Sequence, residues 1–176
     1  MSTGLDSSRV LLRPASEIDY SRRLLFAGTE RQCDVKVRTN QPSRKAFVPT
    51  AWEGFYAETN IPAAVLVGGT LRLTGHTGET ADGSFSTDAE TQIRQVFQNI
   101  ELTLADAGVQ WSDVVEINSF HVGLAAQAEA TMRVAAQFLE DPYPAWTAVG
   151  VTELIIPEAL VEISCVAIVS QPTKEQ

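Results

Sequence analysis

One carboxylate stands inside an apolar segment near the C-terminus. Residues 160–164 read Leu-Val-Glu-Ile-Ser, the composition of a β-strand, with Glu162 at the centre. Burying a carboxylate costs free energy unless the group is paired or used in chemistry. Two interpretations of Glu162 follow. It is either a general acid/base that orients or activates water, with a pKa raised by burial, or a structural carboxylate held by backbone N–H groups or an arginine.

Other side chains able to bind or react lie near the ends of predicted strands. Trp146 offers a broad apolar wall and one N–H donor, and Thr147 follows it directly. His76 comes after the pair Thr74 and Gly75 and is able to carry a proton or to donate to a ligand carbonyl. The alternative for His76 is a loop histidine with a local hydrogen bond.

The composition excludes several classes of function. The chain has 176 residues, 44% of them apolar and 20% charged, and a formal net charge of -9. An acidic chain is a poor match for nucleic acid or for anionic membranes, because both require a basic surface. The two histidines and two cysteines have no metal-site spacing, so we expect no metal and no cofactor. With no signal peptide and no apolar span in view, we expect a cytoplasmic protein.

The first part of the chain differs from the rest. Six of the thirteen basic residues fall within the first 36 positions. We expect an N-terminal extension over residues 1–48 that wraps the main domain or a neighbouring subunit. The main domain is expected over residues 49–170 and a polar tail over 171–176.

The apolar periodicity of the main domain predicts the order β-β-α-β-α-β-β. The expected strands are 64–67, 70–74, 114–122, 145–151 and 159–169, and the expected helices lie between about 88 and 107 and over 125–139. Two helices and one mixed sheet indicate an α+β fold. The last strand is apolar on both faces, so a second copy is expected to cover the face that the helices leave free.

Several segments together resemble the reactive intermediate deaminase superfamily, also called Rid or YjgF. The similar segments are Pro62 with Ala64-Val65, residues 67–71 with Thr74-Gly75, residues 95–100, residues 104–108, residues 143–145 and residues 160–163. The resemblance implies a chorismate-mutase-like α+β fold and a homotrimer with pockets between adjacent subunits.

In the deaminating members an arginine after a Pro-Ala pair grips the substrate carboxylate, and a strand glutamate positions water. The resemblance places Glu162 at the glutamate position and Trp146 at the arginine position. The Ser-Gly pair of the family matches Thr74-Gly75, whereas its Pro-Tyr-Ser tyrosine falls on Ala63. Replacing the arginine removes a permanently charged clamp, which costs roughly 2–5 kcal/mol in binding a carboxylate.

The resemblance therefore implies hydrolytic deamination of a reactive imine or enamine, other than the ordinary small 2-imino acids. Glu162 would be catalytic, and Trp146, Thr74, Gly75, His76 and Thr147 would bind the small-molecule substrate. Two alternatives stand beside this: another acid/base reaction, such as tautomerisation or hydrolysis in a specialised pathway, and a non-catalytic ligand-binding trimer. The ribonuclease activity of some family members fits poorly with an acidic chain.

Overall fold

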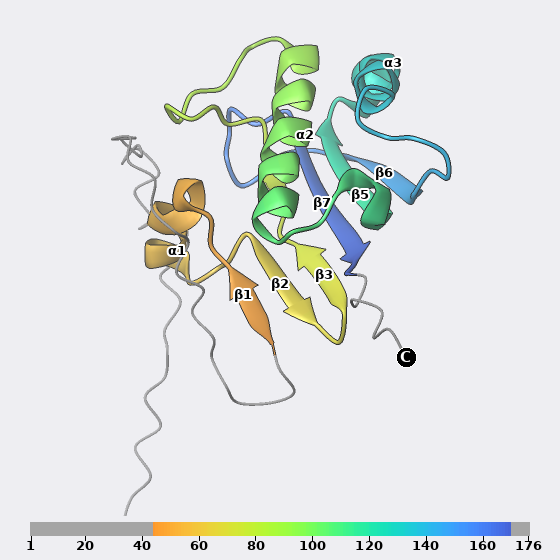
Figure 1. Ribbon diagram of the computed structural model, residues 1–176. Helices are drawn as coiled ribbons and strands as arrows, with labels where there is room; N and C mark the ends of the chain where they lie inside the picture. The colour runs from red at the N-terminus through yellow and green to blue at the C-terminus, as the bar shows by residue number, and fades with distance from the viewer. Residues whose placement is uncertain (1–43, 170–176) are drawn as a thin grey trace, which may run out of the picture.

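The computed structural model describes residues 44–169, in which one mixed β-sheet packs against helices (Figure 1). The strands are β1 (Lys45–Phe47), β2 (Ala64–Val67), β3 (Thr70–Leu73), β4 (His76–Thr77), β5 (Val114–Val122), β6 (Ala145–Val151) and β7 (Val161–Ile168). The helices are η2 (Thr50–Trp52), α1 (Glu53–Thr59), α2 (Ala89–Asp106), η3 (Trp111–Asp113) and α3 (Leu124–Ala135).

The sheet has the order β1-β2-β3-β7-β5-β6, and β4 pairs with β7 beyond the end of β3. β5 and β6 run parallel, and the other pairs are antiparallel. Gly68 and Gly69 both have positive φ and form the tight turn between β2 and β3 that the Gly-Gly pair predicts. The mixed sheet with its helices confirms the expected α+β class.

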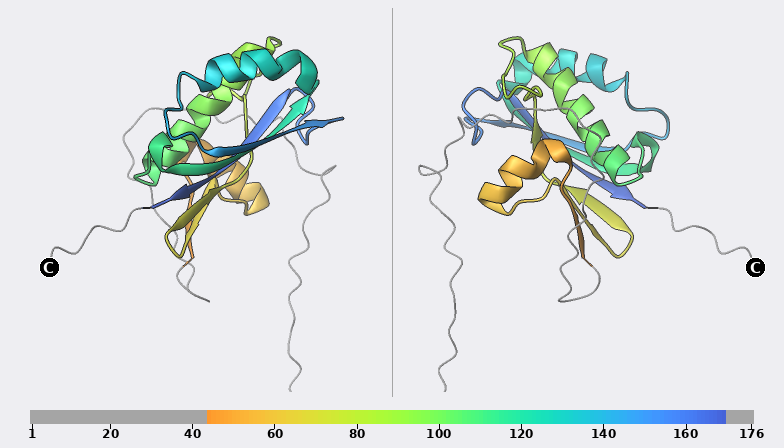
Figure 2. Two further views of the ribbon diagram at one scale, coloured as in Figure 1. Left: turned by 90° about the vertical axis from the view of Figure 1, so that its right-hand side faces the viewer. Right: turned by 60° about the vertical axis from the view of Figure 1, so that its left-hand side comes forward.

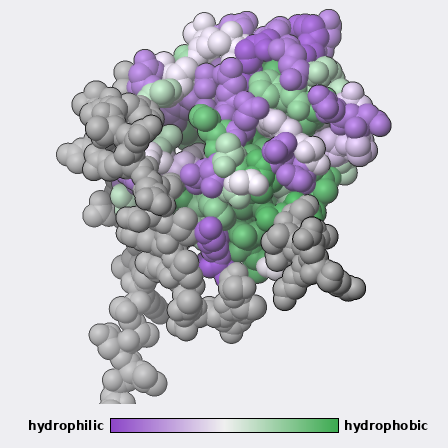
Figure 3. Space-filling model, in the orientation of Figure 1, coloured by the Kyte–Doolittle hydropathy of each residue, from purple (hydrophilic) through white to green (hydrophobic). Residues whose placement is uncertain are grey.

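The two long helices cover one face of the sheet (Figure 2). The side chain of Asp88 caps α2 by accepting from the backbone N–H of Thr91 at 2.8 Å. That stripe is the centre of the core, and its fully buried members are Ile93, Val96, Phe97, Ile100 and Leu104. Hydrophilic residues gather over the upper part of the molecule, where α2 and α3 lie, and hydrophobic residues are concentrated below (Figure 3).

Five short elements, β1, η2, α1, β4 and η3, are absent from the elements expected from the sequence. β1 extends the sheet beside β2, so Lys45–Phe47 belongs to the sheet and not to an extension ending at residue 48. A short helix, α1, follows η2 and ends at Asn60, which has φ 58. Asn at such a position is a known helix stop, and with Pro62 after it the signal was present in the sequence. The expected extension and polar tail otherwise lie outside the described residues.

The second face of the sheet carries neither α2 nor α3 (Figure 2). Along β7 the buried residues are Val161, Ile163, Cys165 and Ala167, and the residues between them are less buried. Strand alternation thus directs Glu162 to the side away from the two long helices, hereafter the open face. None of the described helices is long and apolar enough to cross a membrane.

Candidate functional site

Glu162 packs directly against Gly75. A β-carbon built at position 75 would lie 2.6 Å from Cδ and 2.8 Å from Cγ of Glu162, so the glutamate side chain occupies that space. The neighbouring strand β4 fixes this arrangement, because Thr77 pairs with Glu162 and His76 pairs with Ile163. The structure therefore brings together two of the residues predicted for the site, from segments almost ninety positions apart.

The carboxyl group of Glu162 is half-buried and unpaired. Burial raises its pKa above the usual value for a glutamate. Within residues 44–169 no side-chain hydrogen bond or ion pair engages it, so the interpretation as a capped or ion-paired structural carboxylate finds no support there. A partly accessible carboxylate with a raised pKa is a stronger base than an ordinary glutamate and is suited to accept a proton from water.

The residues beside Glu162 on the open face come from β5 and β6. Phe120 pairs with Glu162, and Val149 pairs with Phe120, which makes one continuous row across three strands. Thr147 is in register with Asn118 in the adjacent row. Thr147 was predicted for the site from the sequence, whereas Phe120 and Asn118 were not. The alternation along Val114–Val122 indicates that Phe120 and Asn118 share one side of the strand.

Trp146 lies on the other face from Glu162. Its ring meets that of Phe97 at a centroid distance of 6.2 Å, and its Nε1–H donates to the hydroxyl of Ser119 at 2.9 Å. In register it opposes Ile117, which is fully buried. The described chain does not bring Trp146 to Glu162, because adjacent residues of a strand face opposite sides and Thr147 takes the open one.

His76 also points away from Glu162, toward α2. Its Nδ1 donates to the backbone carbonyl of Thr74 at 2.7 Å, which leaves Nε2 to accept from the Thr103 hydroxyl at 2.8 Å. Burial lowers the pKa of His76 to about 4, so the ring is neutral near neutral pH. Its two nitrogens are occupied by protein partners, and it does not lie on the open face of the sheet.

The hydroxyl of Thr74 also has a hydrogen-bond partner within the protein. It donates to the carbonyl of Pro62 at 2.6 Å and thereby ties the end of β3 to the segment before β2. His121, the other histidine, is fully buried and bonds through Nδ1 to Gln127, as a structural residue would. Of the predicted set, Glu162 and Gly75 are in contact and Thr147 shares their face, whereas Trp146 and His76 lie behind the sheet.

No cluster of three or more His, Cys, Asp or Glu side chains able to hold a metal ion occurs among the described residues. A cavity of about 290 Å³ lies beside α2, but Glu162 is not among the residues that line it. The candidate site is thus a surface around Glu162 on the open face of the sheet.

Comparisons with known proteins agree with these motifs. Residues 53–169 match the family model described as Endoribonuclease L-PSP. The chain is 39% identical over 112 residues to the RutC family protein YjgH of Escherichia coli, covering 63% of this chain and 86% of that protein. It is 32% identical over 112 residues to a 2-iminobutanoate/2-iminopropanoate deaminase of Dermatophagoides farinae, covering 60% and 83%.

Solved structures give the same assignment. A structure of protein YjgH superposes with a TM-score of 0.66 at 36% identity, covering 73% of this chain and 98% of that one. A member of the YjgF/YER057c/UK114 family from Mycobacterium tuberculosis gives 0.62 at 28% identity, covering 72% and 100%. The chain therefore belongs to the endoribonuclease L-PSP family, the Rid/YjgF superfamily that its sequence motifs resemble.

Proposed function

We propose that this protein hydrolyses a reactive imine, or the imine tautomer of an enamine, with Glu162 as the acid/base. The observation that carries the proposal is the unpaired, half-buried Glu162 carboxyl packed on Gly75, at the position where the family motif has its glutamate. A relative named as a 2-iminobutanoate/2-iminopropanoate deaminase supports the reaction class. The acidic charge of the chain argues against the RNA cleavage that the family name suggests.

The chemistry needs only water and one proton carrier. The ionised Glu162 accepts a proton from a water molecule as its oxygen adds to the imine carbon, and the proton passes to the nitrogen. In the resulting carbinolamine, Glu162 takes the hydroxyl proton and passes it to the nitrogen. The C–N bond then breaks, its electron pair leaves with the nitrogen as ammonia, and the carbonyl forms. The sum is R₂C=NH + H₂O → R₂C=O + NH₃, and no metal or organic cofactor takes part in it.

The surroundings of Glu162 favour a substrate with little negative charge. Phe120 and Val149 supply an apolar wall in the same row, and Thr147 adds a hydroxyl in the next. Position 146 supplies no cation, because its tryptophan is packed behind the sheet against Phe97. We therefore assign an apolar or aromatic imine in preference to a small 2-imino acid. Trp146 contributes by fixing the strand that presents Thr147.

A homotrimer completes the proposal. Val115, Val149 and Ile168 are each more than two-fifths exposed in the single chain, an apolar surface that a neighbouring copy would cover. Adjacent copies would then enclose Glu162 and exclude bulk water from the reacting imine. Sedimentation velocity of the whole protein checks this part of the proposal, and a monomer at micromolar concentration would contradict it.

The test is the loss of activity in Glu162→Gln, which keeps the shape of the side chain and removes its basicity. Imines are made in situ by an amine or amino-acid oxidase, and competition with semicarbazide reports their hydrolysis. The matched control is Glu116→Gln, an exposed open-face carboxylate in β5 that accepts from Asn118. We expect the first variant to lose activity and the second to retain it. Equal activity of Glu162→Gln and the native protein would remove Glu162 from the mechanism.

One observation favours a second candidate, a trimer that binds a ligand without reacting. The arginine position holds a packed tryptophan, so the carboxylate clamp of the deaminating members is missing. That reading predicts ligand affinity that Glu162→Gln leaves intact, with no acceleration of hydrolysis for any imine offered.

A further inference from the structure

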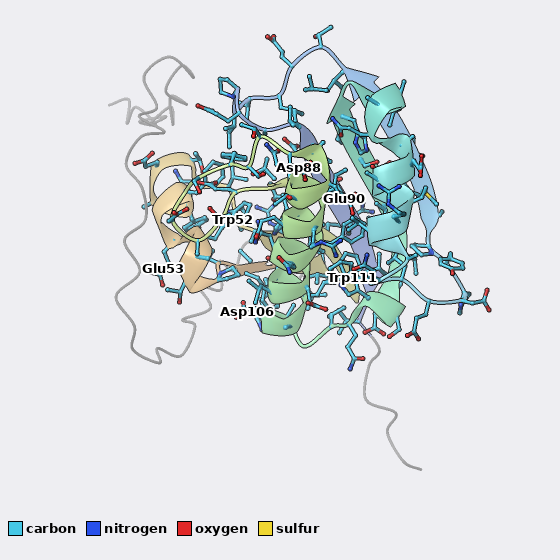
Figure 4. All side chains as sticks on the ribbon, turned by 90° about the horizontal axis from the view of Figure 1, so that it is seen from above. Trp52, Glu53, Asp88, Glu90, Asp106 and Trp111 are labelled. Carbon is cyan, nitrogen blue, oxygen red and sulfur yellow. The ribbon has the colours of Figure 1, made fainter. Side chains whose placement is uncertain are left out.

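A second site lies behind the sheet, away from Glu162. The cavity of about 290 Å³ is bounded by the segment from Pro49 to Trp52, by the loop after β4, and by one side of α2. Figure 4 shows Trp52 in the space between α1 and α2. The proposed imine hydrolysis does not use this cavity.

Hydrogen bonds within the protein hold the walls of the cavity in place and use the N–H groups of Trp52 and Asn99. The indole N–H of Trp52 donates to the carbonyl of Ile61 at 2.9 Å, and the ring lies 4.7 Å from that of His76. Asn99 uses its amide N–H groups on the carbonyls of Thr77 and Glu79, both at 2.9 Å. The loop after β4 is thereby tied to α2, and the cavity exists before any ligand enters.

Two of the lining residues keep an acceptor without a partner. Glu79 lines the cavity, and its carboxylate has no hydrogen bond or ion pair to any described side chain. Gln95 donates its amide to Asn99 at 2.9 Å, which leaves its oxygen without a partner among the described residues. Among residues 44–169, no Lys or Arg lines the cavity. A ligand must therefore bring hydrogen-bond donors and would profit from a positive charge.

The apolar part of the lining sets the shape of that ligand. The apolar residues of the lining include Ala51, Trp52, Ala81 and Leu102. An aromatic face attracts cations as well as apolar groups, with the strongest effect at tryptophan. The volume is at the small end of ligand pockets, which suits a compact molecule.

We propose that this cavity binds a small organic cation, an ammonium or amidinium group on a compact apolar body, with Glu79 as the counter-ion and Trp52 as the aromatic wall. The cation lies between the Glu79 carboxylate and the Trp52 ring and donates to the oxygen of Gln95. The inference is independent of the proposed imine chemistry, because it uses residues on the other side of β4. Partial burial raises the pKa of Glu79, which a bound cation would oppose.

Calorimetric titration of the full chain with benzylammonium chloride tests this at neutral pH. Benzyl alcohol is the neutral probe of similar shape, and benzoate is the probe of opposite charge. We expect benzylammonium to bind at least tenfold more tightly than benzyl alcohol, and benzoate not to bind. Glu79→Gln should remove the tenfold preference. The control Glu140→Gln, an exposed glutamate after α3, should keep it.

Two results would overturn the inference. One is an equal affinity for benzylammonium and benzyl alcohol, or no binding of either. The other is a charge preference that survives Glu79→Gln but disappears in Glu162→Gln, which would place the cation on the open face. Circular dichroism of Glu79→Gln verifies that the fold is retained, and Trp52→Leu supplies a second variant, expected to weaken benzylammonium at least fivefold.

Discussion

The Glu162 side chain lies where a side chain at Gly75 would have to be. The Cδ and Cγ atoms of the glutamate are 2.6 and 2.8 Å from the position of a β-carbon on Gly75. The β4–β7 pairing holds this contact in register, since Thr77 opposes Glu162. The absence of a side chain at 75 therefore sets the position of the carboxylate on which the proposed chemistry depends.

Gly75→Ala is expected to displace the Glu162 carboxylate and to reduce imine hydrolysis on the order of 100-fold, because small misplacements of a reacting group have effects of that size. Global stability should fall only modestly, since the flexible end of a side chain is what must move. Rates and urea midpoints of both proteins check the two parts of this expectation.

The matched control is Gly150→Ala. A β-carbon there would meet Cβ of Leu124 at 3.5 Å, an ordinary contact, and we expect little change in rate. A Gly75→Ala protein that is as active as the native one would show that the position of Glu162 does not limit the reaction.

The pH dependence of the reaction should report the environment of Glu162. The general base is the ionised form, so kcat/KM falls as the pH falls through the pKa of Glu162, which burial raises above 4.5. We expect the acidic limb of the profile above the ordinary glutamate range. A limb at or below that range would assign the titration to another group.

The same burial predicts a stability gain on neutralising this residue. Above its raised folded-state pKa, the ionised carboxylate carries a desolvation cost that the unfolded chain does not. Glu162→Gln should therefore be at least as stable as the native protein at neutral pH while losing activity. Urea denaturation of both proteins at the same protein concentration measures the difference in their free energies of unfolding. A clear loss of stability in Glu162→Gln would reveal a structural partner of the carboxylate.

His76 should make the fold sensitive to mild acid. Its folded-state pKa of about 4 lies below the unfolded value of 6.5, so the unfolded chain binds more protons between these values. The contribution of neutral His76 to the stability of the fold is fully present above the pKa of the unfolded chain. It is lost as the pH falls toward the pKa of the folded chain. The shift corresponds to about 3 kcal/mol in total, of which about 2 kcal/mol is lost by a pH of about 5.

The check is a comparison with His76→Gln, which cannot titrate. Both proteins contain the same carboxylates, so the difference between their urea midpoints isolates the histidine. That difference should shrink as the pH is lowered from about 7 to about 5. A constant difference would mean that His76 titrates alike in the folded and unfolded chains.

Trp146 should behave as a core residue. Trp146→Phe loses the 2.9 Å hydrogen bond to Ser119 and is expected to cost about 1 kcal/mol. Trp146→Arg places a charge against Phe97 and is expected to cost about 3 kcal/mol, without new activity on small 2-imino acids. Urea unfolding measures the stability of each variant, and the semicarbazide assay measures its activity on 2-imino acids. A stable Trp146→Arg protein that gains 2-imino acid hydrolysis would show that position 146 reaches the substrate.

Local sequence patterns were sufficient to predict the long helices, most of the strands and the family. The apolar stripe of α2, its acidic cap at Asp88 and the Gly68-Gly69 turn depend on residues a few positions apart, so the sequence determined them. The strands Val114–Val122 and Ala145–Val151 have the expected bounds for the same reason. The strand β4 has only two residues, too few to show the alternation of apolar and polar residues typical of a strand. It is defined only by its pairing with β7.

The membership of the site was decided by tertiary structure. Sequence alone identified Glu162 as an unusual carboxylate. The family resemblance grouped Trp146 with it through the arginine position, and the preceding Thr74-Gly75 pair grouped His76 with it. Which face a strand turns to the helices depends on packing across the whole sheet, and the helices cover the side of Trp146 and His76. The contact between Glu162 and Gly75 and the cavity beside Trp52 arise only when distant segments pair, because the register between strands fixes them.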